Sequence, residues 1–246
     1  MPEQTIHILH LFPDLLNLYG DKGNLAALCK RLTWRGIEAT VTTVTQDSKE
    51  LSLDDVDIVF LGGGSDREQM TVAERLMPYK QALKDYVEQG GVLLGFCGGF
   101  ELLGTSWWAG DIQTDGLGIL DIHAERGEQR FIGDVVLSSD WTEQPICGFE
   151  NHPGRMQIGD YQPLGKVIAG HGNDGVSALE GVLYKNVFAT YLHGPLLPKN
   201  PELCDSILTR ALTKKYPDFA ELSPLDDTLE LAANRFIVQN FSGNEK

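Results

Sequence analysis

The stretch VLLGFCGGFELLG, residues 92–104, decides the fold prediction. Its first five residues, Val92 to Phe96, form a compact apolar run that is typical of a buried strand. Cys97 follows, and two glycines then lead into residues with helical spacing. A sharp turn from strand to helix needs small residues around its tip, and glycines stand on both sides of Cys97. The stretch therefore predicts a turn that presents the Cys97 thiol where a strand gives way to a helix.

Short apolar or β-branched runs alternate with longer helical patterns in the first half of the chain. Parallel strands produce this alternation, because a helix carries the chain back to the start of the next strand. The sequence therefore predicts an α/β fold with a mostly parallel central sheet and helices on both faces. The predicted elements are strands at 5–11, 39–44, 57–61 and 92–96 and helices at 24–35 and 78–89.

The second half is richer in strand patterns and returns to helices from about residue 201. It contains no linker, repeat or low-complexity tract. We therefore expect one domain over residues 1–240 and a polar tail at 241–246. The predicted elements are strands at 117–121, 131–137 and 186–192 and helices at 201–216 and 226–238.

The composition excludes several classes of protein. The chain has 246 residues and a formal net charge of −15, whereas binding to nucleic acid needs a basic face. No window is long and apolar enough for a membrane span, and the first residues lack the pattern of a signal peptide. The four cysteines are scattered and form no CxxC pair. We therefore expect a cytoplasmic protein with reduced thiols and no bound metal.

Cys97 is the first candidate for a catalytic residue. A thiol at the start of a helix meets the helix dipole and free backbone N–H groups, which lower its pKa toward neutrality. The N–H of Gly98 is placed to stabilise an oxyanion that forms beside the sulfur. The alternative is a buried structural cysteine, the commoner fate of this residue type. Cys29 and Cys204, in predicted amphipathic helices, fit that structural role.

A second glycine cluster, Gly62 to Gly64, follows another short buried strand. In an open α/β sheet the ligand site gathers loops at the carboxyl ends of strands, so this cluster and Cys97 are expected to face the same site. The N–H groups of Gly63 and Gly64 are candidates for a second oxyanion donor. A phosphate-binding nest and a turn that merely needs glycine are the alternatives.

A thiol nucleophile needs a proton acceptor, and the chain has six histidines. His193 is the first candidate, because it ends a strand-like run and precedes Gly194, which allows close approach. His152, in a polar loop, is the second candidate. The remaining histidines are His7, His10, His123 and His171.

A third group usually orients the imidazole of such a pair. Pro195 stands two residues after His193, so no carboxylate follows directly. Three possibilities stay open. Cys97 and His193 act as a dyad, an acid such as Glu150 or Asp66 joins them from elsewhere in the chain, or another subunit supplies a carboxylate.

Six segments together resemble the cobyric-acid-synthase-like branch of the class I glutamine amidotransferases. That branch has a nucleophilic cysteine and a late His-Gly pair, and it lacks the His-x-Glu of other class I enzymes. The resemblance extends from about residue 6 to residue 215 and narrows to the glutaminase subunits of lipid II isoglutaminyl synthases from Gram-positive bacteria. Phe96, Phe100 and Pro153 depart from the usual family residues. The segments are LNLYGDKGN (16–24), GGGSDREQ (62–69), GFCGGFELLG (95–104), GFENH (148–152), YKN (184–186) and ATYLHGPLLPKN (189–200).

The resemblance implies roles for particular residues. It implies that Cys97 is the nucleophile and His193 the base. The pattern QRFIGD (129–134) implies that Arg130 binds the glutamine. A planar guanidinium can hold the α-carboxylate of a free amino acid through two hydrogen bonds. Without the resemblance, Arg130 would be interpreted as a solvated charge at a strand edge.

The resemblance also implies a partner. This chain would hydrolyse L-glutamine without a cofactor of its own and deliver ammonia to a Mur-ligase-like synthetase subunit (MurT-type). That partner would use ATP and Mg to activate the α-carboxyl of the D-glutamate in the lipid II stem peptide. Lipid II would therefore be reached only through the partner. The chain itself has no recognisable ATP-binding loop, which is consistent with this division.

Three other interpretations follow from the same residues. An amidotransferase subunit for another carboxylate, such as a corrinoid, would differ in the substrate that its partner activates. A stand-alone cysteine hydrolase would turn over peptides or aldehydes without glutamine. A binding module with an inactive site would leave Cys97 unreactive toward a glutamine-analogue electrophile.

Overall fold

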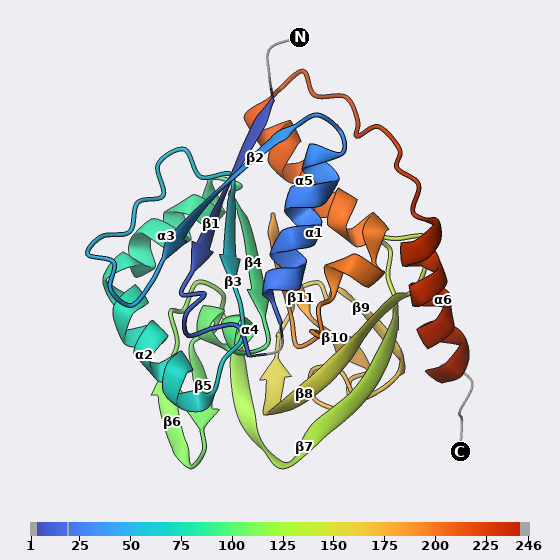
Figure 1. Cartoon of the computed structure of the whole chain (residues 1–246). Helices are drawn as coiled ribbons and strands as arrows, with labels where there is room; N and C mark the ends of the chain where they lie inside the picture. Colours follow the sequence, from blue (N-terminus) through green and yellow to red (C-terminus); the bar gives the residue numbers. More distant parts are fainter. Residues whose placement is uncertain (1–3, 19, 242–246) are drawn as a thin grey trace.

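The computed structural model describes residues 4–18 and 20–241. A six-stranded central sheet has the order β11-β12-β4-β3-β1-β2. All neighbouring strands are parallel except the edge strand β11, which runs antiparallel to β12. The predicted parallel sheet is therefore confirmed (Figure 1). Its strands are β1 (Thr5–Leu11), β2 (Glu38–Val44), β3 (Ile58–Leu61), β4 (Val92–Phe96), β11 (Val182–Tyr184) and β12 (Val187–Thr190).

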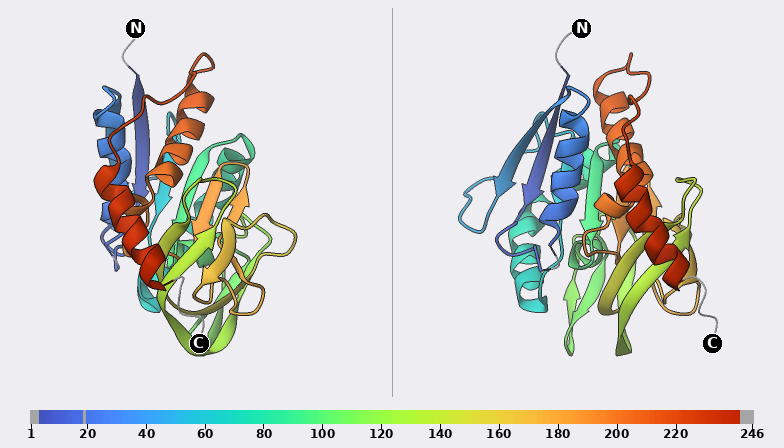
Figure 2. Two further views of the ribbon diagram at one scale, coloured as in Figure 1. Left: turned by 90° about the vertical axis from the view of Figure 1, so that its right-hand side faces the viewer. Right: turned by 45° about the vertical axis from the view of Figure 1, so that its right-hand side comes forward.

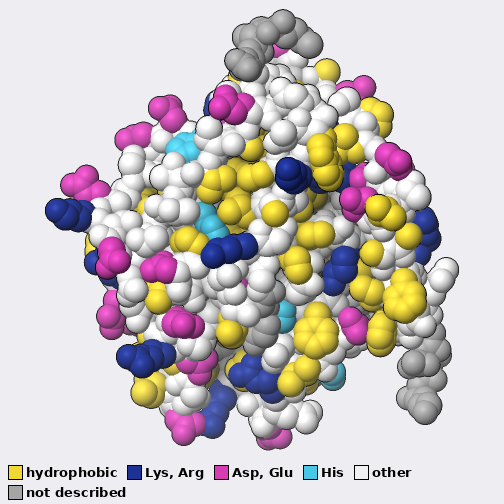
Figure 3. Space-filling view, viewed as in Figure 1, with side chains coloured by type: hydrophobic (Ala, Val, Ile, Leu, Met, Phe, Trp, Pro, Cys, Tyr) yellow, Lys and Arg dark blue, Asp and Glu magenta, His cyan; other side chains and the backbone are white. Residues whose placement is uncertain are grey.

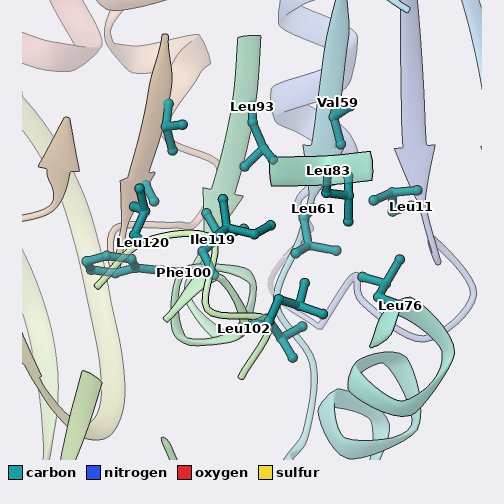
Figure 4. Packing of buried hydrophobic residues seen from close by; sticks show 14 of the residues in the cluster. Leu11, Val59, Leu61, Leu76, Leu83, Leu93, Phe100, Leu102, Ile119 and Leu120 are labelled. Carbon is teal, nitrogen blue, oxygen red and sulfur yellow. The ribbon is translucent and has the colours of Figure 1, made fainter. Parts of the chain in front are cut away.

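Helices cover both faces of the central sheet, as predicted. Successive strand residues point to opposite faces. Phe60 of β3 belongs to the buried cluster that includes α1 and α5, whereas its neighbours Val59 and Leu61 pack toward α2 and α3. Figure 4 shows Val59 and Leu61 close to Leu83 and Leu93. The helices are α1 (Lys22–Thr33), α2 (Asp66–Leu76), the 3-10 turn η1 (Met77–Tyr79), α3 (Lys80–Glu88) and α5 (Pro201–Lys215).

A second six-stranded sheet lies beyond the carboxyl ends of the parallel strands (Figures 1 and 2). Its order is β10-β9-β7-β5-β6, with β8 paired to β7, and most of its pairs are antiparallel. The sequence predicted only one segment of this sheet, 131–137, which lies within β7. The strands are β5 (Ser106–Ala109), β6 (Ile112–Asp115), β7 (His123–Ser138), β8 (Ile146–Gln157), β9 (Gly165–Ala169) and β10 (Leu179–Glu180).

Two local predictions differ from the structure. The apolar run 117–121 is not a strand, because its amides bond to the end of α4 (Gly98–Leu103) instead of to a neighbouring strand. Figure 4 shows Ile119 and Leu120 packed beside Phe100. Helix α2 was not predicted, although Ser65 and Glu68 form a capping box at its start.

The C-terminal helices are tied to the body of the molecule by ion pairs. The Arg31 side chain of α1 is 4% exposed, and its Nε lies 2.6 Å from Asp205 Oδ1 of α5. Its Nη1 lies 2.5 Å from Asp227 Oδ1, one residue before α6 (Thr228–Phe241). Phe241, which the sequence analysis assigned to the tail at 241–246, is still helical, and residues 242–246 lie outside the described residues.

The surface shared by α1 and α6 is apolar. Trp34, Leu229 and Phe236 are all more than half exposed. Figure 3 shows apolar side chains gathered on the side of the molecule where these two helices lie. Within residues 4–18 and 20–241, no helix is both long enough and apolar enough to cross a membrane.

Glu180 joins the two sheets through buried hydrogen bonds. Its Oε1 atom accepts a bond of 2.6 Å from the Thr190 hydroxyl at the end of β12 and one of 2.8 Å from the Tyr191 N–H. Burial raises the pKa of Glu180 to about 7, against the bonds from Thr190 and Tyr191, which lower it. The carboxyl therefore keeps its proton at a pH where an exposed glutamate has lost it.

We expect Glu180→Gln to stabilise the protein more at pH 8 than at pH 5. The folded chain binds the Glu180 proton more tightly than the unfolded chain, so this group lowers the free energy of unfolding as the pH rises from about 4.5 to about 7. The variant does not lose this stability. Its gain in the free energy of unfolding over the unmodified protein should therefore be about 2–3 kcal/mol larger at pH 8 than at pH 5. Urea denaturation at both pH values measures it. Glu125→Gln, at an exposed site on β7, is the control, and an equal effect of Glu180→Gln at both pH values would contradict the expectation.

Candidate active site

The sharp turn from strand to helix that the sequence predicts is present at Cys97, and its backbone is strained. Cys97 follows β4, precedes α4, and has φ 51° and ψ −108°, a combination that residues with a side chain rarely adopt. Its N–H donates a hydrogen bond of 2.8 Å to the Thr190 carbonyl, so β12 supports the start of the turn. Strain at a position that the surrounding structure enforces is common at active sites.

The two glycine clusters touch each other through their backbones. A Cβ atom on Gly99 would lie 2.5 Å from the Leu61 carbonyl oxygen, and one on Gly63 would lie 3.0 Å from the Cβ of Cys97. The first distance leaves no room for a side chain on Gly99, and the second would force Cys97 to shift. The carboxyl ends of β3 and β4 therefore meet at one site, as the sequence predicts.

A cavity of about 510 Å³ opens beside the Cys97 turn. Cys97 itself is 8% exposed. Four of the six residues predicted for the site line this cavity, namely Cys97, Gly98, Gly64 and Arg130. The remaining lining residues are Leu18, Ser65, Asp66, Arg67, Gln69, Glu101, Ile132, Asn151, His152 and Pro153.

The prediction that the turn lowers the pKa of Cys97 is wrong for this structure. Burial raises the pKa of the thiol, and the nearby carboxyls of Glu101 and Asp21 raise it further. The Gly98 N–H and the Arg130 charge lower it, but they do not compensate for the loss of water. The thiol is therefore protonated at rest, and a base has to remove its proton before attack.

Alkylation of Cys97 by iodoacetamide is expected to accelerate with pH from 7 to above 9, without a plateau near neutrality. Only the thiolate reacts, and the raised pKa of Cys97 keeps the thiol neutral at pH 7. Mass spectrometry of the Cys97 peptide measures the rate. The Cys29→Ala variant removes the partly exposed thiol on α1 and serves as the background. A rate that is already maximal at pH 7 would contradict this expectation.

His193 follows β12, the strand next to β4, so it and Cys97 lie beyond the carboxyl ends of neighbouring strands. It is buried, and its N–H and carbonyl exchange hydrogen bonds with Phe149 of β8. Burial lowers the pKa of His193 to about 4, and the His152 and Lys199 charges lower it further. The imidazole is therefore neutral at pH 7 and able to accept a proton.

Glu150, one of the acids considered for a third catalytic group, orients other histidines. Its Oε1 atom lies 2.6 Å from His171 Nδ1, and its Oε2 atom accepts a bond of 3.0 Å from the Gly172 N–H. His152 Nε2 lies 3.6 Å from Glu150 Oε2. Asp66, the other acid considered, accepts the N–H of Gly110.

Glu101 and Gln69 are site residues that the sequence analysis missed. Glu101 lies one helical turn after Cys97 and accepts bonds of 3.0 Å from Gln69 Nε2 and 2.9 Å from the Tyr191 hydroxyl. Burial raises the pKa of Glu101 to about 7. The Tyr191 ring stacks on the His152 ring at 3.6 Å. The sequence signal that would have identified Glu101 is its spacing of four residues from Cys97, which places the two residues on the same side of a helix.

Arg130 lies on β7 where the pairing with β8 shifts register, between Arg126 and Phe131. Its Nη1 donates to the backbone carbonyl and the side chain of Asn151, at 3.2 and 3.1 Å. The guanidinium lines the cavity and lowers the pKa values of Cys97 and Glu101 through its charge. It is therefore placed to bind an anionic group beside the thiol.

The N–H groups of the predicted oxyanion glycines differ in their partners. The Gly63 N–H donates a bond of 2.9 Å to Asp21 Oδ2, so it is already engaged. Gly64 and Gly98 both line the cavity, and a Cβ on Gly98 would lie 3.5 Å from the Gly64 nitrogen. The amides of Gly64 and Gly98 are therefore the pair of donors that this geometry favours.

The other histidines and cysteines have different surroundings. His10 is buried edge-on against Phe60, and burial lowers its pKa to about 4. His7 contacts Thr42, and His123 is half-exposed on β7. All four cysteines are free thiols. Within the described part of the chain, no group of three His, Cys, Asp or Glu side chains is arranged to hold a metal ion.

A strained cysteine between strand and helix, beside a glycine loop and a cavity that contains Arg130, is the arrangement expected of a cysteine-dependent amidotransferase on an α/β fold. Residues 7–201 match the CobB/CobQ-like glutamine amidotransferase domain, and the chain belongs to that family.

Two relatives span nearly the same length as this chain. It is 40% identical over 247 aligned positions to the lipid II isoglutaminyl synthase (glutamine-hydrolyzing) subunit GatD of Staphylococcus aureus, covering 100% of this chain and 99% of that protein. It is 38% identical to the GatD subunit of Streptococcus pneumoniae, covering 91% and 87%. Among solved structures, PurLQS from Thermotoga maritima shares the fold with a TM-score of 0.52 and 18% identity, covering 86% of this chain and 98% of that chain.

Proposed function

We propose that this chain is the glutamine-hydrolysing subunit of a lipid II isoglutaminyl synthase. The observation that carries the proposal is the strained Cys97 turn, open to a cavity with Arg130, in a chain 40% identical over its whole length to a GatD subunit. The cobyric-acid synthases match a shorter part of the chain, for example 65% of it at 29% identity. The full-length similarity therefore favours lipid II over a corrinoid as the acceptor.

The first half of the reaction forms a thioester. Neutral His193 takes the proton of the Cys97 thiol, and the sulfur attacks the side-chain amide carbon of L-glutamine. The carbonyl oxygen becomes an oxyanion between the N–H groups of Gly98 and Gly64, each of which contributes about 3–4 kcal/mol. His193 then returns the proton to the amide nitrogen, the C–N bond breaks and ammonia leaves.

The second half regenerates the enzyme. His193 removes a proton from a water molecule, which attacks the γ-glutamyl thioester and displaces the sulfur. The products are glutamate and the free Cys97 thiol. Arg130 holds the α-carboxylate of the amino acid through both steps and so fixes the amide carbon next to the sulfur.

The ammonia has to reach a partner subunit before solvent protonates it. We propose a Mur-ligase-like synthetase of the MurT type, acting in the cytoplasm, that activates the D-glutamate α-carboxyl with ATP and Mg. The name of the GatD relatives as subunits and the apolar α1–α6 surface support a docked partner. The third catalytic group is proposed to be a partner carboxylate, since Glu150 and Asp66 are engaged elsewhere.

Replacing Cys97 with alanine is expected to abolish glutamine hydrolysis and glutamine-dependent amidation of lipid II by the reconstituted complex. Amidation should return when an ammonium salt replaces glutamine, because the synthetase needs only ammonia. Coupled assays of glutamate release and of lipid II mass measure the two steps. Cys29→Ala is the matched control and keeps both activities. Glutamate release above background in Cys97→Ala would overturn the nucleophile assignment, and a failure of ammonium to restore amidation would overturn the role as ammonia donor.

Replacing Arg130 with alanine is expected to raise the KM for glutamine about 10- to 100-fold with a smaller change in kcat, because a charge-assisted bond to the substrate carboxylate is lost. Arg130→Lys keeps the charge without the planar fork and should fall in between. Steady-state kinetics of the complex measure both. Arg126→Ala on the same strand, paired with Asp111 at the surface, is the control. An unchanged KM in Arg130→Ala would remove Arg130 from substrate binding.

A further inference from the structure

Asp21 is a buried acid whose side chain does not serve its own helix. It stands at the N-cap position of α1 and is 0% exposed, yet its side chain makes no capping bond. An aspartate at this position normally accepts a bond from an N–H in the first turn of the helix. Here Oδ2 accepts the Gly63 N–H at 2.9 Å, 42 positions further along the chain.

The segment that leads to Asp21 encloses the Gly62–Gly64 loop from one side. The Leu18 N–H donates a bond of 3.0 Å to the Gly63 carbonyl, so Leu18 and Asp21 together hold both polar groups of Gly63. A Cβ on Gly62 would lie 2.5 Å from the Leu16 carbonyl oxygen. The loop therefore packs closely against the backbone of Leu16.

The other side of the loop rests on the nucleophile turn. A Cβ on Gly63 would lie 3.0 Å from Cys97 Cβ and 3.3 Å from the Gly98 nitrogen. Because the Gly63 N–H is committed to Asp21, Gly64 supplies the amide of this loop that lines the cavity next to Gly98. Asp21 fixes the Gly62–Gly63 peptide, and Leu18 holds the carbonyl of the Gly63–Gly64 peptide, to which the Gly64 N–H belongs. The two bonds together therefore determine where the second oxyanion donor lies.

We propose that Asp21 is a positioning residue for glutamine hydrolysis, which holds the Gly63 amide and thereby places the Gly64 N–H against the oxyanion that forms beside Cys97. This inference rests on the proposed glutaminase function. Asp21 itself touches no reacting atom. Its contribution is the preorganisation of a backbone donor, which is the feature that makes such donors effective.

The carboxyl also affects the thiol by its charge. Burial raises the pKa of Asp21 to about 6, and the Gly63 N–H lowers it, so most of the carboxyl is ionised at pH 8. The negative charge raises the pKa of Cys97. The hydrogen bond between Asp21 and Gly63 and the effect of the Asp21 charge on the pKa of Cys97 can therefore be separated. Asparagine keeps an acceptor for the Gly63 N–H and removes only the charge.

Two substitutions test the positioning role in the glutaminase complex. Asp21→Asn retains an oxygen acceptor for the Gly63 N–H. Asp21→Ser restores an ordinary cap for α1, which favours folding, but its hydroxyl is one bond too short to reach Gly63. Asn24→Ala is the matched control, because Asn24 is equally buried at the start of α1 and accepts the Leu197 N–H at 2.8 Å instead of a loop amide.

The expected result is a loss of about 10-fold or more in kcat for Asp21→Ser, with KM within about twofold, because a misplaced oxyanion donor acts on the transition state. Asp21→Asn and Asn24→Ala should stay within about threefold of the unmodified complex. Iodoacetamide alkylation of Cys97 forms no oxyanion. Both Asp21 variants should therefore be alkylated faster than the unmodified chain at pH 7, even though only the serine variant loses turnover.

An unchanged kcat in Asp21→Ser would overturn the proposal, and so would equal losses in the serine and asparagine variants. A loss of kcat in Asp21→Ser that is accompanied by an equal loss of Cys97 alkylation would also overturn it, since the nucleophile turn itself would then be damaged. The activity of the unmodified complex distinguishes a failure of the proposed glutaminase function from a failure of the role proposed for Asp21. If it does not hydrolyse glutamine, the proposed function fails, whereas an active complex with an active serine variant removes only the role of Asp21.

Discussion

The contact between two turns of bare backbone is the constraint on which this site depends. The loops after β3 and β4 meet so closely that Gly99 cannot carry a Cβ atom, and one on Gly63 would crowd the Cβ of Cys97 at 3.0 Å. The same contact holds Cys97 in a conformation that it would not adopt alone. The parallel sheet supplies the contact, because β3 and β4 are neighbouring parallel strands and their carboxyl ends bring the two loops to the same edge of the sheet. Nucleophile and oxyanion donors are therefore consequences of strand order.

The electrostatics of the resting site favour neutral groups. Burial keeps a proton on the Cys97 thiol and raises the pKa of Glu101 to about 7, while it lowers the pKa of His193 to about 4. Each shift follows from the same loss of water, which penalises whichever form is charged. A site of this kind gains reactivity only when a substrate brings the charges that compensate one another, such as a carboxylate that meets Arg130.

The sequence predicts the inner strands of the central sheet well, because β3, β4 and β12 are buried along their whole length and form short apolar runs. β1 and β4 match their predicted bounds. The second sheet is harder to predict, since β7 and β8 are long and rich in polar residues, and β7 is largely exposed. The run 117–121 was predicted as a strand because it is apolar, and that prediction is wrong. It is apolar because it packs on α4, and burial by itself does not distinguish a strand from a packed turn.

Within the site, the sequence predicts residues that have local signatures and misses those that act through distant partners. Cys97 is flanked by glycines, and His193 ends a strand, so both are visible in the pattern. The bond from Gly63 to Asp21 joins positions 42 residues apart, and the bond between Tyr191 and Glu101 spans 90. Contacts of that range depend on the strand order, which a single sequence leaves open.

The ion pairs of Arg31 bear on where the family domain ends. The family match stops at residue 201, whereas Asp205 and Asp227, both beyond it, neutralise the enclosed guanidinium of α1. A chain that ended at residue 201 would lack both carboxylates that neutralise the buried Arg31 guanidinium. It would also expose the apolar side of α1 against which α5 packs. The folded unit therefore extends past the end of the family match, and α6 belongs to it, because Asn234 of this helix donates to the Pro145 carbonyl and to Asn200 Oδ1.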